Sequence, residues 1–345
     1  MKITHSRVKL TSSDLTAVKS ILSSGMIAQG KNVTAFETQI AKYHGLKYAV
    51  AVNSGTSAIH LALLSLNIKA GDEVIIPSYT CSALLNPIKY VGASPVLVDI
   101  DPYTLNICPI HTKSHITSKT KAIIVPHMFG RTANIKAIIK LGIPVIEDCA
   151  QAIGANIEGR KVGTFGHISV FSFYATKVIT TGEGGMICSN DRKIIKKIHD
   201  LREYDDKEDT VTRFNYKMTD FQAALGISQL KQLNANIKHR RAIAKIFDQA
   251  VQNKEFIPKN DPGQIYFRYI LKIPESIKQN FMEQMQKNGI TCRNPIFKPL
   301  HKYLPGFYCP HTERLARTAI SIPIYSNLNS AEISFIKKHL HHLTF

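Results

Sequence analysis

The stretch YAVAVNSGTSAIHLALLSL, residues 48–66, decides the fold class of this chain. Its first five residues favour a strand, its middle is a run of small residues, and its end carries apolar side chains at helical spacing. A strand that passes through a tight turn into a helix is the repeating unit of a mostly parallel sheet.

The same alternation continues to about residue 190. Several of the later apolar runs are apolar on both faces, as strands inside a parallel sheet are. Strands are expected at 73–77, 95–100, 121–126, 144–149, 167–173 and 185–189, and helices at 81–91, 132–141 and 191–203. The sequence therefore predicts an α/β protein with a mostly parallel central sheet flanked by helices.

A change in composition near residue 252 marks the expected domain boundary. A long helical pattern follows Asp220 and gives way there to a connector rich in Pro, Asn and Lys. The remaining residues predict a strand at 266–273 and helices at 276–289, 311–319 and 329–342. We expect a large domain over 1–251, whose N-terminal segment packs near the small lobe, and a small C-terminal α/β domain over 252–345.

The formal net charge of +19 in 345 residues is compatible with an anionic small substrate. The lysines are dispersed and form no basic arm, so we expect no nucleic-acid partner. No run approaches the ~18 apolar residues that span a bilayer, and the N-terminus lacks the apolar core of a signal peptide. The six cysteines have no metal-ligand spacing, so we expect reduced thiols, no metal site and a cytoplasmic protein.

Lys177 is the first residue that indicates chemistry. It lies in FSFYATKVITTGEGG (171–185), just after a predicted strand and before a glycine run that allows a ligand to approach the backbone. Burial lowers the pKa of a lysine toward the neutral amine that attacks a carbonyl carbon. The alternative is a surface lysine on a loop.

Two further segments lie at predicted strand ends. Asp148 closes an apolar strand, where α/β folds bind ligands, and its carboxylate could hold a pyridinium nitrogen protonated. A helix cap or a metal ligand would explain it as well. Residues 53–57, NSGTS, could receive a phosphate at a helix N-terminus or be an ordinary cap. TGEGG (181–185) lacks the order of a dinucleotide loop and leads into a strand, so we reject that reading.

In their order, these segments resemble the DegT/DnrJ family of sugar aminotransferases, which are fold-type I pyridoxal-phosphate enzymes. The likeness extends over nearly the whole chain. The matching segments are 24–37, 48–63, 71–80, 92–101, 145–155, 171–186 and 214–230.

The resemblance implies a role for each matching residue. Lys177 would carry pyridoxal 5'-phosphate as a Schiff base, Asp148 would pair with the pyridine nitrogen, and Gln151 would lie beside the phenolic oxygen. Tyr79 matches a position where an aromatic ring stacks on the pyridine. The implied phosphate contacts are Gly55, Thr56 and Ser172, together with Asn215 of the neighbouring subunit in a homodimer with shared active sites.

The resemblance also implies a reaction. An amino acid, expected to be glutamate, would convert the cofactor to pyridoxamine 5'-phosphate, and the amine would then pass to a keto-sugar. The expected acceptor is a nucleotide-linked 4-keto-6-deoxy hexose, used for surface-glycan or related amino-sugar biosynthesis. Some family members carry histidine in place of the lysine and catalyse dehydration, so Lys177 favours transamination. The alternatives are another keto-sugar or cyclitol as substrate, or a non-catalytic regulator that binds a sugar nucleotide.

The chain departs from the family pattern where the sugar nucleotide should bind. The segment between Leu201 and Asn215 is short, Arg213 replaces a more usual glycine, and residues 293–301 match loosely. Candidate contacts to a diphosphate in that last stretch are Arg293, Lys298 and His301, and the alternative there is a solvated loop.

Overall fold

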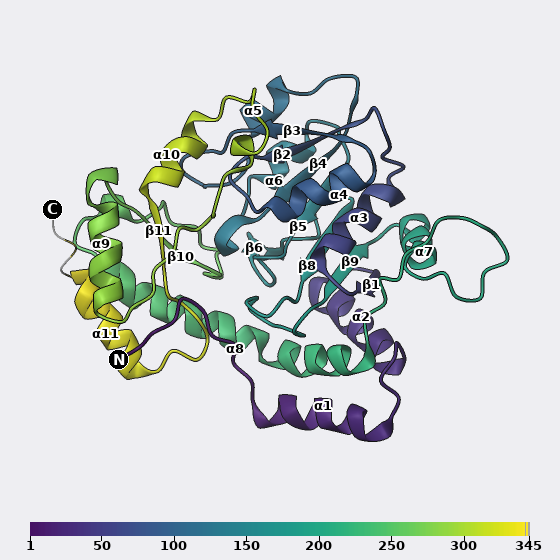
Figure 1. The fold of residues 1–345 in the computed structure, drawn as a ribbon, viewed down its shortest axis with the longest axis horizontal. Helices are drawn as coiled ribbons and strands as arrows, with labels where there is room; N and C mark the ends of the chain where they lie inside the picture. The colour runs from purple at the N-terminus through teal and green to yellow at the C-terminus, as the bar shows by residue number, and fades with distance from the viewer. Residues whose placement is uncertain (342, 344–345) are drawn as a thin grey trace.

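A seven-stranded sheet lies at the centre of the computed structural model, which describes residues 1–341 and 343 (Figure 1). Its strands are β1 (Tyr48–Val52), β2 (Glu73–Pro77), β3 (Ser94–Val98), β4 (Thr120–Pro126), β5 (Val145–Asp148), β8 (Ile168–Ser172) and β9 (Gly185–Ser189). They follow the order β1-β9-β8-β5-β4-β2-β3. The strands from β8 to β3 pair in parallel, and β9 runs antiparallel to its two neighbours. The predicted α/β class is confirmed.

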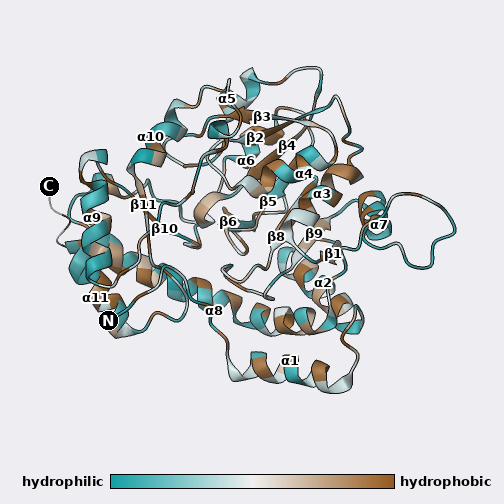
Figure 2. Ribbon diagram, viewed as in Figure 1, coloured by the Kyte–Doolittle hydropathy of each residue, from teal (hydrophilic) through white to brown (hydrophobic). Residues whose placement is uncertain are grey.

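Both faces of the sheet are buried, which explains the continuous apolar runs. In β2, Val74 and Ile76 belong to one apolar cluster, whereas Ile75 belongs to another. Successive side chains of a strand point to opposite faces, so each strand contributes to two cores. Figure 2 shows the hydrophobic colour on strands of the central sheet and on α3, whereas α9 is mostly hydrophilic.

Helices cover the two faces. The first cluster includes residues of α3 (Gly55–Ser65), α4 (Leu85–Tyr90) and α7 (Arg192–Leu201). The clusters on the other side include residues of α2 (Lys31–His44), α6 (Ile135–Ile139) and α8 (Asp220–Ala250). The expected arrangement of helices around the sheet is therefore confirmed.

The 31-residue helix α8 connects the central sheet to a second core (Figure 1). Its N-terminal part packs on α2 and on α1 (Ser12–Ser24), and its last turns join a cluster that also contains Ile3. The other elements around this cluster are β10 (Tyr269–Lys272), β11 (Ala319–Ile322), α9 (Glu275–Lys287), α10 (Pro310–Thr318) and α11 (Ser330–His341). The division at residue 251 stays a prediction.

Several elements were not expected from the sequence. They are α1, α2, β11, the helix α5 (Pro109–Ser114) and a hairpin of β6 (Asn156–Ile157) and β7 (Arg160–Lys161). The strand expected at 266–273 begins only at Tyr269, because Tyr266 adopts a φ of 54° that breaks extended backbone. Residue 342 of the last predicted helix lies outside the described residues. Over residues 1–341 and 343, no helix is long and apolar enough to cross a membrane.

Candidate active site

A cavity of about 250 Å³ lies at the carboxyl edge of the sheet, where β2, β5 and β8 end and α3 begins. Parallel strands bring their carboxyl ends to one edge, so residues distant in sequence meet there. Six of the predicted site residues line this cavity: Gly55, Thr56, Asp148, Gln151, Ser172 and Lys177.

A closed loop between β8 and β9 presents Lys177 to the cavity. The N–H of Phe173 donates to the Gly184 carbonyl over 2.8 Å, and the N–H of Thr181 donates to the Phe173 carbonyl over 2.9 Å. The loop is therefore fixed at its base, and the side chain of Lys177 is half-buried. Burial lowers the pKa of its amine, and the charge of Asp148 opposes that shift. This environment favours the neutral amine and excludes the alternative of a fully exposed surface lysine.

Asp148 is buried at the end of β5, with only 7% of its surface exposed. Its Oδ1 accepts a hydrogen bond from the Ala150 N–H over 2.9 Å. Burial raises the pKa of this carboxyl, and the Ala150 N–H and Lys177 only partly oppose the shift. Within the described part of the chain, its Oδ2 accepts no hydrogen bond. The carboxylate thus has capacity left for a cationic ring N–H in the cavity.

Gln151 has a defined orientation. Its Oε1 accepts from the Phe129 N–H over 2.9 Å, so the amide NH₂ is the group left for a ligand. Phe129 has a φ of 62°, an uncommon backbone conformation for a buried aromatic residue. This strained residue positions Gln151 at the cavity wall.

The N-terminus of α3 can receive an anion. Ser54 caps the helix by accepting from the Ser57 N–H over 3.0 Å, while the N–H groups of Gly55 and Thr56 precede the first intrahelical bonds. A Cβ at Gly55 would lie 2.9 Å from the Ser172 Cβ, closer than real Cβ contacts. Glycine is therefore required for this close approach of α3 and β8, and the resulting cradle suits a phosphate.

Two predicted residues lie elsewhere. The Ser78 N–H donates to the Val98 carbonyl and so extends the pairing of β2 with β3 by one residue. The next residue, Tyr79, is fully buried, and the centroid of its ring lies 6.1 Å from that of Phe129. Its ring does not line the cavity, whose wall after β2 is formed by Thr80 and Cys81, so the cavity gives no support for the expected stacking role of Tyr79. Asn215 is exposed, and its carbonyl accepts from the Asn53 side chain over 3.3 Å. Its role toward a neighbouring subunit stays a prediction.

The candidates for a diphosphate contact line neither the 250 Å³ cavity nor the smaller one beside Lys177. The His301 ring forms hydrogen bonds with the Ser78 hydroxyl and, over 2.8 Å, with the Glu313 carboxylate. It therefore connects the segment after β2 to α10. Lys298 lies over the Tyr303 ring, 4.4 Å from its centroid. Arg293 is exposed, with its backbone paired to that of Ser321. The structure therefore gives His301 a tethering role instead.

Sequence reasoning missed other lining residues. Thr80, Cys81, Tyr174 and Glu183 also face the cavity. Thr80 and Cys81 follow the carboxyl end of β2, so the rule that identified Asp148 could have found them. Tyr174 and Glu183 carry no comparable signal, because the loop closure that brings them in is a tertiary contact.

A smaller cavity of about 80 Å³ lies on the other side of Lys177. Its basic lining residues are Arg7, Lys9, Arg240 and Arg268, which come from the N-terminal segment, α8 and the segment before β10. Lys177 thus lines two cavities. The larger one also contains a carboxylate and a phosphate cradle, and the smaller one is rich in cations.

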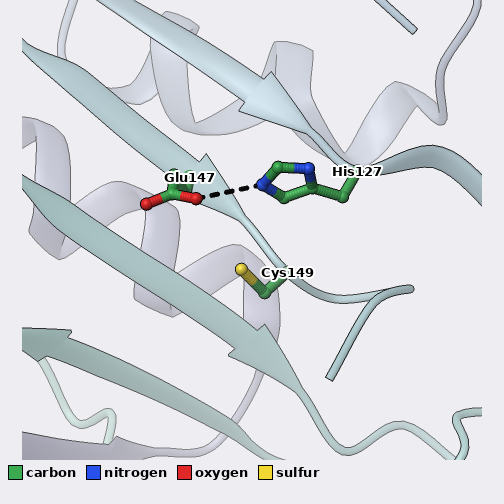
Figure 3. Close-up of side chains that lie close together, drawn as sticks. All are labelled: His127, Glu147 and Cys149. Atoms are coloured by element: carbon green, nitrogen blue, oxygen red, sulfur yellow. Dashed lines mark hydrogen bonds and ion pairs between the residues drawn. The ribbon is translucent and has the colours of Figure 1, made fainter. Parts of the chain in front are cut away.

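His127, Glu147 and Cys149 form a buried cluster beside the site (Figure 3). Glu147 accepts from His127 Nε2 over 3.1 Å and from the N–H groups of Gly163, Phe165 and Gly166. The other nitrogen of His127 accepts from the Ala133 N–H over 3.0 Å. Burial raises the pKa of Cys149 well above its ordinary value, which disfavours the thiolate that binds metals. These hydrogen bonds make the cluster a structural brace.

Known proteins resemble this chain in sequence and in fold. Residues 8–341 match the DegT/DnrJ/EryC1/StrS aminotransferase family. A GDP-perosamine synthase of Escherichia coli O157:H7 is 34% identical over 345 residues, which cover 95% of this chain and 94% of the relative. Among solved structures, the aminotransferase TlmJ of Streptoalloteichus hindustanus superposes with a TM-score of 0.93 at 28% identity and 98% coverage of both chains. The PLP form of Spr1654 from Streptococcus pneumoniae, described as a sugar aminotransferase, gives 0.92 at 25% identity, covering 99% of this chain and 98% of that one.

Proposed function

This chain belongs to the DegT/DnrJ/EryC1/StrS aminotransferase family, and on that premise we propose that it transfers an amino group from an amino acid to a nucleotide-linked keto-sugar. Membership makes it a pyridoxal-phosphate-dependent aminotransferase. The residues around the larger cavity suit this cofactor, because a helix N-terminus, a buried carboxylate and a half-buried lysine converge there.

The position of Lys177 between the two cavities is the observation that supports transfer most directly. A group that moves protons must reach the bound cofactor from one side and the substrate from the other. Burial lowers the pKa of its amine, which favours the neutral form that can accept a proton. Lysine, unlike the histidine of dehydrating relatives, fits transamination.

Pyridoxal phosphate, when bound, supplies an electron sink that stabilises negative charge on the adjacent substrate carbon. Asp148 would hold a proton on the ring nitrogen, which its unpaired Oδ2 can do as an acceptor. Gly55, Thr56 and Ser172 would bind the phosphate at the start of α3, and the Gln151 NH₂ would donate to the phenolic oxygen. Lys177 would move the proton between the substrate carbon and the cofactor carbon next to the ring.

We propose a nucleoside-diphosphate-linked 4-keto-6-deoxy hexose as acceptor, with guanosine as the first nucleotide to test. The name GDP-perosamine synthase, carried by relatives from Escherichia coli and Caulobacter vibrioides at 34% and 33% identity, supports the choice. The net charge of +19 favours the approach of a doubly charged diphosphate. The product would serve amino-sugar biosynthesis, in a reducing, cytoplasmic compartment that suits the six free cysteines.

We also propose a homodimer in which Asn215 reaches the phosphate of the neighbouring subunit. Exposed large apolar side chains on α1 and the turn after it support an interface with a second subunit. Leu15, Leu22 and Met26 expose 63%, 53% and 77% of their surface. Such a patch on a protein in water favours a partner surface. Asn215 is exposed and therefore accessible to a second copy.

The test starts with the purified protein and its visible spectrum. We expect absorbance from lysine-bound cofactor, its loss on addition of glutamate, and its absence in Lys177→Ala. Adding a GDP-linked 4-keto-6-deoxy hexose should then restore the absorbance and yield an amino-sugar detectable by mass spectrometry.

Other outcomes would redirect the proposal. If a cyclitol ketone or a sugar linked to another nucleotide restores the absorbance and the GDP-linked sugar does not, that compound class becomes the proposed acceptor. A bound cofactor that responds to no amino donor would favour the non-catalytic regulator, and absence of any bound cofactor would contradict the proposed reaction itself.

A further inference from the structure

A third cavity, of about 530 Å³, lies between the last turns of α8, the connector that follows this helix and the segment before β10. We call it the outer cavity, and Arg131, Lys245, Lys259 and Tyr266 are among its lining residues. It shares no lining residue with either cavity beside Lys177. The outer cavity is therefore separate from the candidate active site.

Positive charges outnumber negative ones in this lining. The cations are those of Arg131, Lys245, Lys254 and Lys259, and Asp248 is the single carboxylate. The Nζ of Lys254 donates to the carbonyls of Val251 and Asp248, which are neutral acceptors. In the described part of the chain, none of the four cations forms an ion pair with a carboxylate. This excess of unpaired cations favours an anionic ligand.

Arg131 is the most buried of these cations, with 5% of its surface exposed. Its three nitrogens each donate one hydrogen bond, to the Thr104 carbonyl over 3.2 Å, to Gln264 Oε1 over 3.0 Å and to the Lys259 carbonyl. All three acceptors are neutral. Two of the five N–H groups of the guanidinium are left without an acceptor in the described residues, so they are available to a ligand.

Two tyrosines give the outer cavity a flat aromatic wall. The rings of Tyr266 and Tyr269 are inclined by only 24°, with their centroids 6.4 Å apart. The Tyr269 hydroxyl donates to Asp248 Oδ1 over 2.8 Å, which fixes this ring. Tyr266 is half-buried and has a φ of 54°, an unusual conformation for a bulky residue. Strained backbone of this kind is common where a side chain faces a ligand.

We propose that the outer cavity is a second ligand site, for a nucleoside phosphate, and that its occupancy is transmitted to the active site. The phosphate would bind at Arg131 and the lysines, and the base would stack on Tyr266. The proposal goes beyond the proposed function, because the outer cavity does not adjoin Lys177.

The chemistry of the lining favours a nucleoside phosphate over a simpler anion. A volume of about 530 Å³ lies in the range of ~300–1,000 Å³ typical of sites for whole small molecules, and exceeds what a free phosphate needs. Stacking of a base on an aromatic side chain strengthens binding by roughly 5- to 100-fold. Inorganic phosphate would leave the tyrosines unused, and an uncharged nucleoside would leave the cations unpaired.

Backbone contacts join the outer cavity to the active site. The Ile265 N–H donates to the Gly130 carbonyl over 2.9 Å and so pairs the segment before β10 with the turn that leads into Arg131. In the same turn, the Phe129 N–H donates to Gln151 Oε1 over 2.9 Å. A ligand that contacts both segments therefore acts on the turn that orients Gln151.

A fluorescent reporter can test this site alone, because the chain contains no tryptophan. We expect GMP to quench the fluorescence of Tyr266→Trp holoenzyme to saturation. Guanosine and inorganic phosphate should each require concentrations about 10-fold higher or more. The control reporter is Tyr48→Trp, at the amino end of β1 and so opposite the edge of the sheet that carries the active site. Its fluorescence should not respond at the same concentrations.

Charge variants in the Tyr266→Trp background test the phosphate contacts. Replacing Lys245 and Lys259 together by glutamine should weaken GMP binding by roughly 3- to 10-fold. The matched control is Lys238→Gln, an exposed lysine of the same helix that lines a different cavity, and it should leave the affinity unchanged. Melting temperature reports whether each variant is folded.

Transmission to the active site has its own measurement. GMP should change the visible absorbance of the cofactor in wild type at the concentrations that quench the reporter. Tyr266→Asn should lose this response, because asparagine tolerates the left-handed backbone but offers no ring. Quenching without an absorbance change in wild type would overturn the transmission.

Three results would overturn the site itself. They are no quenching of the Tyr266→Trp reporter by GMP, equal quenching by inorganic phosphate, and an affinity for GMP that is unaffected by loss of the two lysines. None of these measurements requires turnover. A failure of the proposed transamination would therefore be seen separately, as cofactor absorbance that glutamate does not bleach.

Discussion

Two neighbouring carboxylates on β5 differ in how the protein surrounds them. Glu147 and Asp148 are both buried, but they point to opposite sides of the sheet. Glu147 accepts four hydrogen bonds from the protein, and Asp148 accepts one. Burial raises the pKa of Asp148, whereas at Glu147 the hydrogen bonds from His127 and the backbone outweigh burial and lower the pKa.

Under the proposed function, the difference separates a structural carboxylate from one that binds a ligand. A buried carboxylate whose acceptor sites are filled by the protein stabilises the fold and offers little to a ligand. A buried carboxylate with an unfilled site is costly in the empty protein and is favoured only when a ligand completes it. Burial alone therefore does not identify the site, but hydrogen-bond satisfaction does.

The largest expected effect comes from Asp148→Asn. Asparagine is nearly isosteric and can still accept from the Ala150 N–H, but it cannot hold a proton on a pyridine nitrogen by its charge. We expect turnover to fall about 100-fold or more, as when one preorganised electrostatic contact is removed. Stability of the cofactor-free protein should be unchanged or higher. A large loss of stability with near-normal turnover would indicate that Asp148 is structural and would contradict the proposed division of roles between Asp148 and Glu147.

Glu147→Gln should show the opposite pattern. Its amide NH₂ would face donors, either His127 Nε2–H or backbone N–H groups, and would leave buried donors unpaired. We expect a free energy of unfolding lower by about 2 kcal/mol, with cofactor absorbance retained at low temperature. Urea denaturation measures the loss, and a variant as stable as wild type would show that the brace is unimportant.

The stability of wild type relative to Glu147→Gln should depend on pH. The folded pKa of Glu147 lies below its ordinary value of 4.5, so its contribution is present above that value and is lost as the pH falls through the folded pKa. The difference in stability between the two proteins should therefore be largest at pH 7 and should decrease below pH 4.5. Melting temperatures from pH 3 to 7 test this, and a constant gap would contradict the shift.

The smallest effect is expected for Tyr79→Phe. The Tyr79 hydroxyl is buried without a partner in the described residues, but it does not face the cavity. Removing it should change stability by less than about 1 kcal/mol, toward greater stability, and leave cofactor affinity unaltered. Weaker cofactor binding in this variant would return Tyr79 to the active site.

Residues joined to strand ends were predictable from the sequence. Asp148 and the 53–57 turn lie at the ends of strands whose apolar runs were plain, and the edge of a parallel sheet brings such residues together regardless of the loops between them. Gln151 was implied only by the resemblance to the family. The helices α1 and α2 were not predicted because they have few apolar positions and pack against α8, which is distant in sequence.

The sequence by itself determined the parallel sheet, because this depends on local alternation, and its resemblance to a known family implied the reaction class and the residues of the cofactor site. Only the tertiary structure decided that Tyr79 turns into the core while Cys81 faces the cavity, and that His5, Arg240 and Arg268 meet beside Lys177. Where a side chain points beyond a strand end depends on what packs against it. A cluster drawn from segments hundreds of residues apart exists only once the chain has folded.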